Sequence, residues 1–217
     1  MSISSVLTLS NWKSNKNDQA MPSLISSNCE SSSKSMEETL EETIGAQQYY
    51  SITLGVGPLW GPDAPHAALS VSAVNTESRG VGIKQSQLSV SSHIVSEEEL
   101  LKAIKDNESL RLKFTLHLTE TTSVEWETLI WRGTLYIGVP SCLLPEGSKE
   151  GFVSLLEYAE EVLRCNNIVV CLRKDRSDRA MLVRTFMFLG FNVLPPNHAL
   201  VPPNCDSGNL YMLYTVE

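Results

Sequence analysis

The chain has 217 residues, 42% of them hydrophobic and 19% charged, and this composition excludes a wholly disordered polypeptide. Its 17 Lys and Arg against 25 Asp and Glu give a formal net charge of −8, whereas a nucleic-acid binder normally carries the opposite sign on its working face. An acidic chain of this kind is steered toward basic partners.

The cysteines and the hydropathy of the chain narrow the class of protein further. The five cysteines have irregular spacings and form no Cys-x-x-Cys pair, so they indicate neither a disulfide framework nor a zinc site; they are Cys29, Cys142, Cys165, Cys171 and Cys205. No apolar run approaches the roughly 18–20 residues of a membrane span. The N-terminus lacks the basic segment of a signal peptide. We therefore expect a soluble intracellular protein.

Serine dominates the start of the chain, with twelve serines between residues 2 and 35. Such a segment buries too little apolar area to offset the entropy of ordering it. Residues 57–66 read GPLWGPDAPH, a Gly- and Pro-rich composition that fits either a linear motif or a plain linker. We expect residues 1–85 to form a flexible, Ser-rich N-terminal region and residues 86–217 to form the core domain.

The first elements predicted in chain order are a short helix and two strands. Ser96 and Glu99 match the Ser-x-x-Glu capping box, which predicts a helix over the following residues. Residues 110–118 alternate strictly between apolar and polar side chains, as in a strand with one buried face. Residues 134–139 predict a second strand, which Pro140 ends.

Helices and strands then alternate. Ser148 is the predicted N-cap of a helix whose core stripe is Phe152, Leu155, Leu156, Ala159, Val162 and Leu163. The apolar run 168–172 predicts a strand covered on both faces. A second helix over 177–189, ended by Gly190, is apolar on more than one side and is expected to be well buried. With strands at 191–194 and 210–216, this order predicts an α/β sandwich with a mixed sheet.

Motifs for catalysis or cofactor binding are absent from the sequence. No Gly-x-Ser-x-Gly elbow occurs, and Gly147-Ser148-Lys149 has the wrong order for a phosphate loop. No His lies at helical ligand spacing from another His or from a Cys, so no metal site is expected. The basic cluster Arg173, Lys174, Arg176 and Arg179 fits a solvated helix start better than an anion site. We expect no catalytic residues and no cofactor.

An acidic face on the first long helix is the most informative local feature. Glu157, Glu160 and Glu161 point away from its apolar stripe, and Glu157 and Glu161 form an i, i+4 pair of like charges. Such a pair costs a few tenths of a kcal/mol. It is either an ordinary solvated face or a docking surface for a basic patch on another protein.

Two long segments resemble the ornithine decarboxylase antizymes. They are LPEGSKEGFVSLLEYAEEVL over 144–163 and RKDRSDRAMLVRTFMFLGFNVLPPNHALVPP over 173–203. GPLWGPDAPH looks like the place where that family's two reading frames join, near Pro62 and Asp63. The resemblance implies an acetyltransferase-like (GNAT-like) mixed sheet with two main helices, preceded by a disordered N-terminal region. Residues 140–147 lack the Arg/Gln-x-x-Gly-x-Gly/Ala loop of an acetyl-CoA enzyme, so no enzyme activity is expected.

The function that the resemblance implies is inhibition of ornithine decarboxylase. Antizymes bind the decarboxylase monomer as a 1:1 heterodimer, prevent its active homodimer, deliver it to the proteasome without ubiquitin and restrain polyamine uptake. Antizyme inhibitor is a further implied partner, and synthesis by polyamine-stimulated ribosomal frameshifting is implied as well. The expected localisation is cytoplasmic, and a second pool in the nucleus would agree with the resemblance. Neither nucleic-acid binding nor insertion into a membrane is expected.

The family pattern also marks candidate site residues. By resemblance, the partner-binding surface includes Lys149, Glu157, Glu160, Glu161 and Leu194, the last of these at a position that looks like Val in other members. The N-terminal region, where the family carries its degradation-promoting element, differs here. A variant that binds without promoting degradation therefore remains an alternative, and a GNAT-type N-acetyltransferase is a second one.

Overall fold

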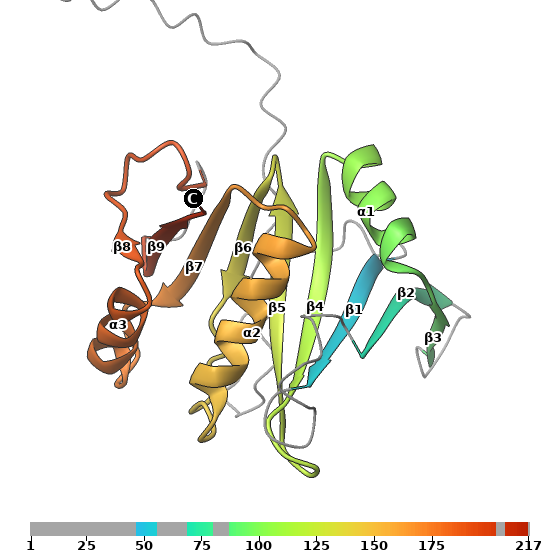
Figure 1. Cartoon of the computed structure of the whole chain (residues 1–217), viewed down its shortest axis with the longest axis horizontal. Helices are drawn as coiled ribbons and strands as arrows, with labels where there is room; N and C mark the ends of the chain where they lie inside the picture. The colour runs from blue at the N-terminus through green and yellow to red at the C-terminus, as the bar shows by residue number, and fades with distance from the viewer. Residues whose placement is uncertain (1–46, 56–68, 80–86, 203–206, 217) are drawn as a thin grey trace, which may run out of the picture.

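The computed structural model describes residues 47–55, 69–79, 87–202 and 207–216, and these form one mixed sheet with helices packed against it (Figure 1). The sheet has nine strands in the order β3-β2-β1-β4-β5-β6-β7-β9-β8. Its strands are β1 (Gln47–Gly55), β2 (Ser70–Arg79), β3 (Gln87–Ile94), β4 (Ser109–His117), β5 (Ser123–Trp131), β6 (Thr134–Gly138), β7 (Asn167–Arg173), β8 (Asn192–Val193) and β9 (Asn209–Thr215). β1–β4 and β6–β7 are parallel pairs, and the other neighbours are antiparallel.

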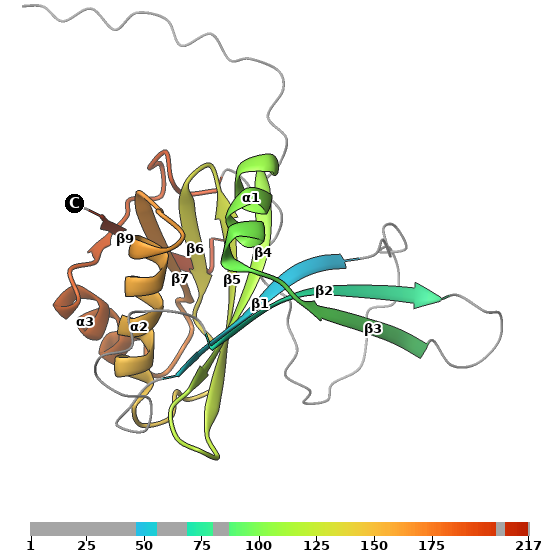
Figure 2. The ribbon, with the colours of Figure 1, turned by 45° about the vertical axis from the view of Figure 1, so that its right-hand side comes forward.

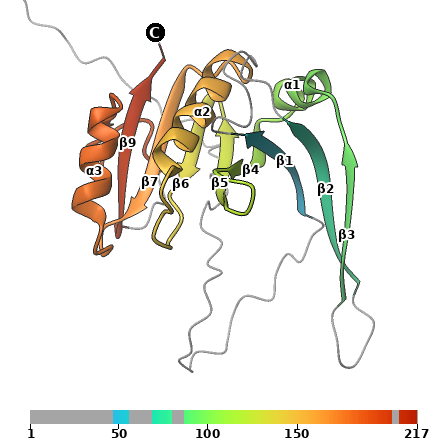
Figure 3. The same ribbon diagram turned by 60° about the horizontal axis from the view of Figure 1, so that its bottom comes forward.

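The helices cover one face of this sheet. They are α1 (Glu97–Asp106), α2 (Ser148–Glu161) and α3 (Arg179–Phe188). In Figures 1 and 3, α2 lies over the central strands, α1 lies toward β4 and β1, and α3 lies at the end of the sheet that carries β9. All three helices contribute to a single buried cluster, for which Leu100 of α1, Leu155 of α2 and Phe186 of α3 are examples. This cluster is the main core.

A smaller core lies on the opposite face of the sheet. Alternate residues of β6 and β7 point to it, so that Tyr136 and Val169 belong to the small cluster while Leu135 and Ile168 belong to the main one. The segment after β8 covers this face with Leu194 and Val201. β7 is therefore buried on both faces, which confirms the prediction from its continuous apolar run.

The sheet begins upstream of the expected core domain. β1 pairs with β4 in parallel over Tyr50–Gly55, and β2 and β3 continue the sheet beyond β1 as an antiparallel pair. Figure 2 shows β2 and β3 reaching away from the helices. The domain boundary expected between residues 85 and 86 therefore does not coincide with the start of the sheet, because β1 and β2 lie before residue 86. Residues 1–46 and GPLWGPDAPH lie outside the described residues, so what the sequence predicts for them stays a prediction.

Most elements predicted from residue 96 onward are confirmed, with two corrections. Ser96 and Glu99 form both bonds of the capping box at α1. Ser148 is not the N-cap of α2; Gly147 occupies that position with a left-handed φ of 86°, and the Ser148 hydroxyl instead donates to the carbonyl oxygen of Pro145 at 2.6 Å. The expectation that α3 is well buried is also wrong, because only Leu182 and Phe186 of that helix are buried.

Candidate partner-binding surface

α2 is held firmly against the sheet. Its buried side chains include Phe152, Leu155 and Tyr158, and Gly151 brings the helix close to β4. A Cβ at Gly151 would lie 2.9 Å from Cδ2 of Leu118 and 3.3 Å from Cδ1 of Leu116, so any side chain here would force these leucines to shift. The opposite side of α2 is thereby fixed in position for contact with another molecule.

Four of the five predicted site residues lie together on that outer side. At 3.6 residues per turn, Lys149, Glu157, Glu160 and Glu161 fall within an arc of about 120° around α2. Glu157 and Glu160 are half-buried, whereas Lys149 and Glu161 are exposed. We call Glu157, Glu160 and Glu161 the acidic arc. Its geometry suits a basic partner, while its role in binding stays a prediction.

Lys149 links α2 to α3. Its Nζ lies 4.7 Å from the ring centroid of Phe188, a cation–π contact between the first turn of α2 and the last residue of α3. Contacts of this kind contribute about 0.5–1 kcal/mol at exposed sites. Lys149 therefore belongs to the seam between the two helices as well as to the outer side of α2.

Leu194 does not lie with these four residues. Its side chain is 8% exposed and packs in the small core with Val201 and Tyr211, on the other face of the sheet from α2. Its backbone N–H donates to the carbonyl oxygen of Tyr211 at 2.9 Å. The structure therefore separates Leu194 from the acidic arc, and any direct contact with a partner would come from a second face.

A groove between α2 and α3 was not anticipated from the sequence. It has a volume of about 250 Å³ and is lined by residues that include Trp126, Lys149, Phe152, Met181, Leu182 and Phe186. We call it the α2–α3 groove. Met181 at its edge is 57% exposed, and Phe188 beside Lys149 is 79% exposed. The one signal for it in the sequence is the apolar character of α3 on more than one side, a pattern that predicts burial and not an exposed groove.

Tyr158 is a further residue that the sequence analysis missed. It is a fully buried residue of α2, and its hydroxyl donates to Oε1 of Glu97 on α1 at 3.3 Å. Burial raises the pKa of Tyr158 well above its ordinary value, and the neighbouring Glu97 raises it further. Tyr158 thus stays protonated at neutral pH and connects the two helices.

The basic cluster after β7 has a structural explanation. Arg173 and Arg176 each form a two-bond ion pair with the aspartate two residues later, at 2.7–3.0 Å. Arg176 also donates to the carbonyl oxygens of Pro140 and Cys142, in the connection between β6 and α2. Its hydrogen bonds lower the pKa of Asp178 below the ordinary value. This arrangement supports the interpretation that the cluster is not an anion site.

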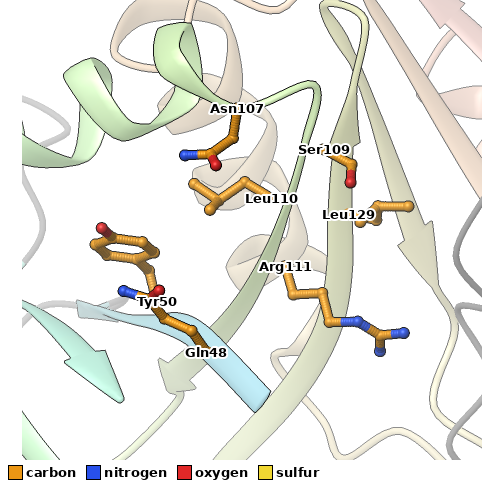
Figure 4. A pocket seen from close by; sticks show the side chains of 7 residues that line it. All are labelled: Gln48, Tyr50, Asn107, Ser109, Leu110, Arg111 and Leu129. Carbon is orange, nitrogen blue, oxygen red and sulfur yellow. The ribbon is translucent and has the colours of Figure 1, made fainter. Parts of the chain in front are cut away.

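A second pocket lies where β1 meets β4 and β5 (Figure 4). Its volume is about 280 Å³, and its lining residues include Gln48, Tyr50, Asn107, Ser109 and Arg111. Among the described residues, its lining has no His, Cys, Asp or Glu, so these residues offer neither a carboxylate nor an imidazole to act as a general base. The pocket therefore gives no support to a catalytic role.

Neither a metal-binding cluster nor a membrane-spanning helix is present among the described residues. Over the described ranges, no group of three or more His, Cys, Asp or Glu is arranged to hold a metal ion. Within the same part of the chain, none of the helices has the length and apolar character needed to span a bilayer. Cys165 and Cys171 are buried free thiols.

Comparison with known proteins identifies the family. The family profile described as ornithine decarboxylase antizyme matches residues 126–216. Ornithine decarboxylase antizyme 1 of Xenopus laevis is 36% identical over 208 residues, which cover 94% of this chain and 87% of that protein. The chain belongs to the ornithine decarboxylase antizyme family.

Other antizymes support the same assignment. Ornithine decarboxylase antizyme 2 of Homo sapiens is 35% identical over 165 residues, or 74% of this chain and 82% of that protein. Ornithine decarboxylase antizyme 2 of Danio rerio is 38% identical over 170 residues, which cover 77% of this chain and 75% of that protein. The stretch matched by the antizyme profile contains α2, α3, the groove between them and Leu194. β1–β4 precede that stretch, so the candidate surface lies in the part that defines the family.

Proposed function

We propose that this chain binds ornithine decarboxylase monomers as a 1:1 heterodimer and so prevents the active homodimer from forming. The observation that carries the proposal is the acidic arc, which lies on the outer side of a firmly packed helix in the stretch matched by the antizyme profile. An acidic surface on an acidic chain favours a basic patch on the partner.

Inhibition follows from mass action. A decarboxylase whose active sites are completed across its homodimer interface loses activity when a tighter heterodimer withdraws monomers. The antizyme needs no chemistry of its own, in keeping with the absence of catalytic motifs from the sequence. In this proposal the chain is a stoichiometric inhibitor and not an enzyme.

The wider regulatory role rests on family membership. We infer that the chain promotes ubiquitin-independent degradation of the decarboxylase by the proteasome, restrains polyamine synthesis and uptake, and is itself sequestered by antizyme inhibitor. Production by ribosomal frameshifting and a cytoplasmic location with a nuclear pool belong to the same proposal.

The proposed fold class is GNAT-like, without acetyl-CoA chemistry. The order β6-α2-β7-α3-β8-β9 supports the likeness. An acetyl-CoA site would present backbone N–H groups to the pyrophosphate before the helix. Here Arg176, the cation beside that connection, is already engaged by the Asp178 carboxylate and by the carbonyl oxygens of Pro140 and Cys142, so it is not available to a pyrophosphate. A calorimetric titration with acetyl-CoA should therefore give no binding heat.

The decisive experiment is a titration of purified ornithine decarboxylase with the full chain, following activity and molecular mass in the same samples. Activity should fall to zero at about one equivalent per decarboxylase monomer, as the homodimer peak becomes a heterodimer peak. Unchanged activity with an intact homodimer would refute the proposal.

Degradation is tested separately. Purified proteasome is added to the heterodimer, and the half-life of the decarboxylase is compared with that of the decarboxylase alone. A shortened half-life without ubiquitin supports the full antizyme role. An unchanged half-life with complete inhibition would assign the chain to the binding-only alternative.

A further inference from the structure

The exposed side of α3 carries apolar side chains beside a formed groove. Met181 is 57% exposed and lines the α2–α3 groove, whose walls include Phe152 and Phe186. Phe188 is 79% exposed and contacts Lys149, which lines the groove from α2. Large apolar side chains exposed around an apolar hollow are typical of a surface that another protein covers.

The groove is continuous with the acidic arc along α2. Lys149 lines the groove and also begins the side of α2 on which Glu157, Glu160 and Glu161 lie. At a rise of 1.5 Å per residue, these carboxylates lie about 12–18 Å along the helix axis from Lys149. One partner surface of ordinary size can therefore reach both features.

Charge around the groove indicates what kind of surface covers it. α2 and the turn before it carry five glutamates and one lysine, Lys149. The glutamates are Glu146, Glu150, Glu157, Glu160 and Glu161. α3 contributes the opposite sign through Arg179 and Arg184. A partner is thus favoured when its basic side chains lie over α2 and not over α3, so the charges also orient it.

We propose that the α2–α3 groove receives an apolar side chain of ornithine decarboxylase, from a surface that places Lys or Arg side chains about 12–18 Å away against the acidic arc. This inference rests on the proposed function and adds the second half of the binding surface. The groove contributes mainly to the lifetime of the complex through desolvated apolar contact, while the acidic arc contributes mainly to the association rate and its salt dependence.

The test uses two variants of the full chain, which change exposed apolar side chains on different sides of α3. Met181→Ser with Phe188→Ser removes the exposed methionine that lines the groove and the exposed ring that contacts the groove residue Lys149. Met187→Ser is the matched control, because Met187 is 58% exposed but lies roughly 120° around the helix from Met181 and does not line the groove. All three residues are largely exposed, so the fold should be retained, and circular dichroism and thermal unfolding verify this.

Binding of each variant to purified ornithine decarboxylase is measured by surface plasmon resonance at several salt concentrations. We expect the double variant to bind roughly tenfold or more weakly, mainly through faster dissociation, with the wild-type salt dependence retained. The Met187→Ser variant should bind like wild type.

The outcomes separate this inference from the proposed function. If the wild-type chain binds the decarboxylase and the double variant binds equally well, the groove is not part of the interface, although the proposed function stands. If Met187→Ser weakens binding as much as the double variant does, the effect is not specific to the groove and the inference fails. If the wild-type chain does not bind the decarboxylase, both proposals are refuted.

Discussion

At the scale of single residues, Tyr136 and Tyr158 bury their phenol groups on opposite faces of the sheet. Burial raises the pKa of Tyr136 to about 12 and raises the pKa of Tyr158 further. In the unfolded chain both groups titrate near about 10. Above pH 10 the unfolded chain therefore loses protons that the folded chain retains, and the free energy of unfolding falls by about 1.4 kcal/mol per pH unit for each tyrosine.

Replacing one of these tyrosines should make the alkaline decline shallower. Tyr136→Phe removes the hydrogen bond from the hydroxyl to the carbonyl oxygen of Leu200, which should cost about 0.5–1.5 kcal/mol at pH 8. Between pH 10 and 12 its stability should then fall by about 1.4 kcal/mol less per pH unit than that of wild type. Urea unfolding at pH 8, 10 and 11 measures both effects. The buried Cys165 thiol, whose pKa is raised to about 12, adds the same decline to both proteins. Equal slopes would contradict the explanation.

At the scale of the elements, α1 depends on its N-terminal cap. The Ser96 Oγ accepts from the N–H of Glu99 at 3.2 Å, and the Ser96 N–H donates to Oε2 of Glu99 at 3.1 Å. Ser96→Ala should therefore lower the free energy of unfolding by about 1 kcal/mol. Ser154→Ala is the control, since the Ser154 hydroxyl donates to the Glu150 carbonyl oxygen within α2 and alanine is the better helix former there. Urea unfolding should separate the two variants; similar values would mean that the cap contributes nothing.

The elements also explain which parts of the fold were predictable from the sequence. β4 and β7 were found because burial imposes a simple pattern along each of them. β5 was missed because Thr128 interrupts its apolar alternation; the structure buries this residue and lets its Oγ1 donate to the carbonyl oxygen of Leu112 at 3.1 Å. β1 was missed because its partner β4 lies about sixty residues away in sequence, a distance that no local pattern records.

The candidate site also has one part that could be predicted from the sequence and one part that could not. The acidic arc could be predicted because the helical period alone puts Glu157, Glu160 and Glu161 on one side of α2. The groove could not, because it depends on how α3 packs beside α2. The apolar residues of α3 indicated burial, yet only one side of the helix faces the core, which leaves Met181 and Phe188 exposed.

At the scale of the whole molecule, the acidic arc is proposed to supply the electrostatic part of decarboxylase binding. Glu157→Lys with Glu161→Lys should weaken decarboxylase binding roughly tenfold or more and flatten its dependence on salt. The fold should be retained, because both side chains lie on the outer side of α2 and a lysine near the helix C-terminus suits the helix dipole. Asp106→Lys with Glu120→Lys is the control, since it makes the same change of net charge at exposed positions elsewhere, one of them the last residue of α1. If both pairs of reversals weaken binding equally, net charge and not the acidic arc governs association.

Leu194 tests whether a second face takes part in binding. Because its side chain packs in the small core with Val201 and Tyr211, Leu194→Ala should cost about 2–4 kcal/mol of stability, whereas Leu194→Met should cost less than about 1.5 kcal/mol. We expect decarboxylase binding by Leu194→Ala to fall only as far as the fraction of folded protein falls, and binding by Leu194→Met to remain near wild type. Urea unfolding and binding at a temperature where each variant is folded measure the two quantities on the same samples. A binding loss beyond the loss of folded protein would instead assign Leu194 a direct contact with the partner, which would then have to reach both faces of the sheet.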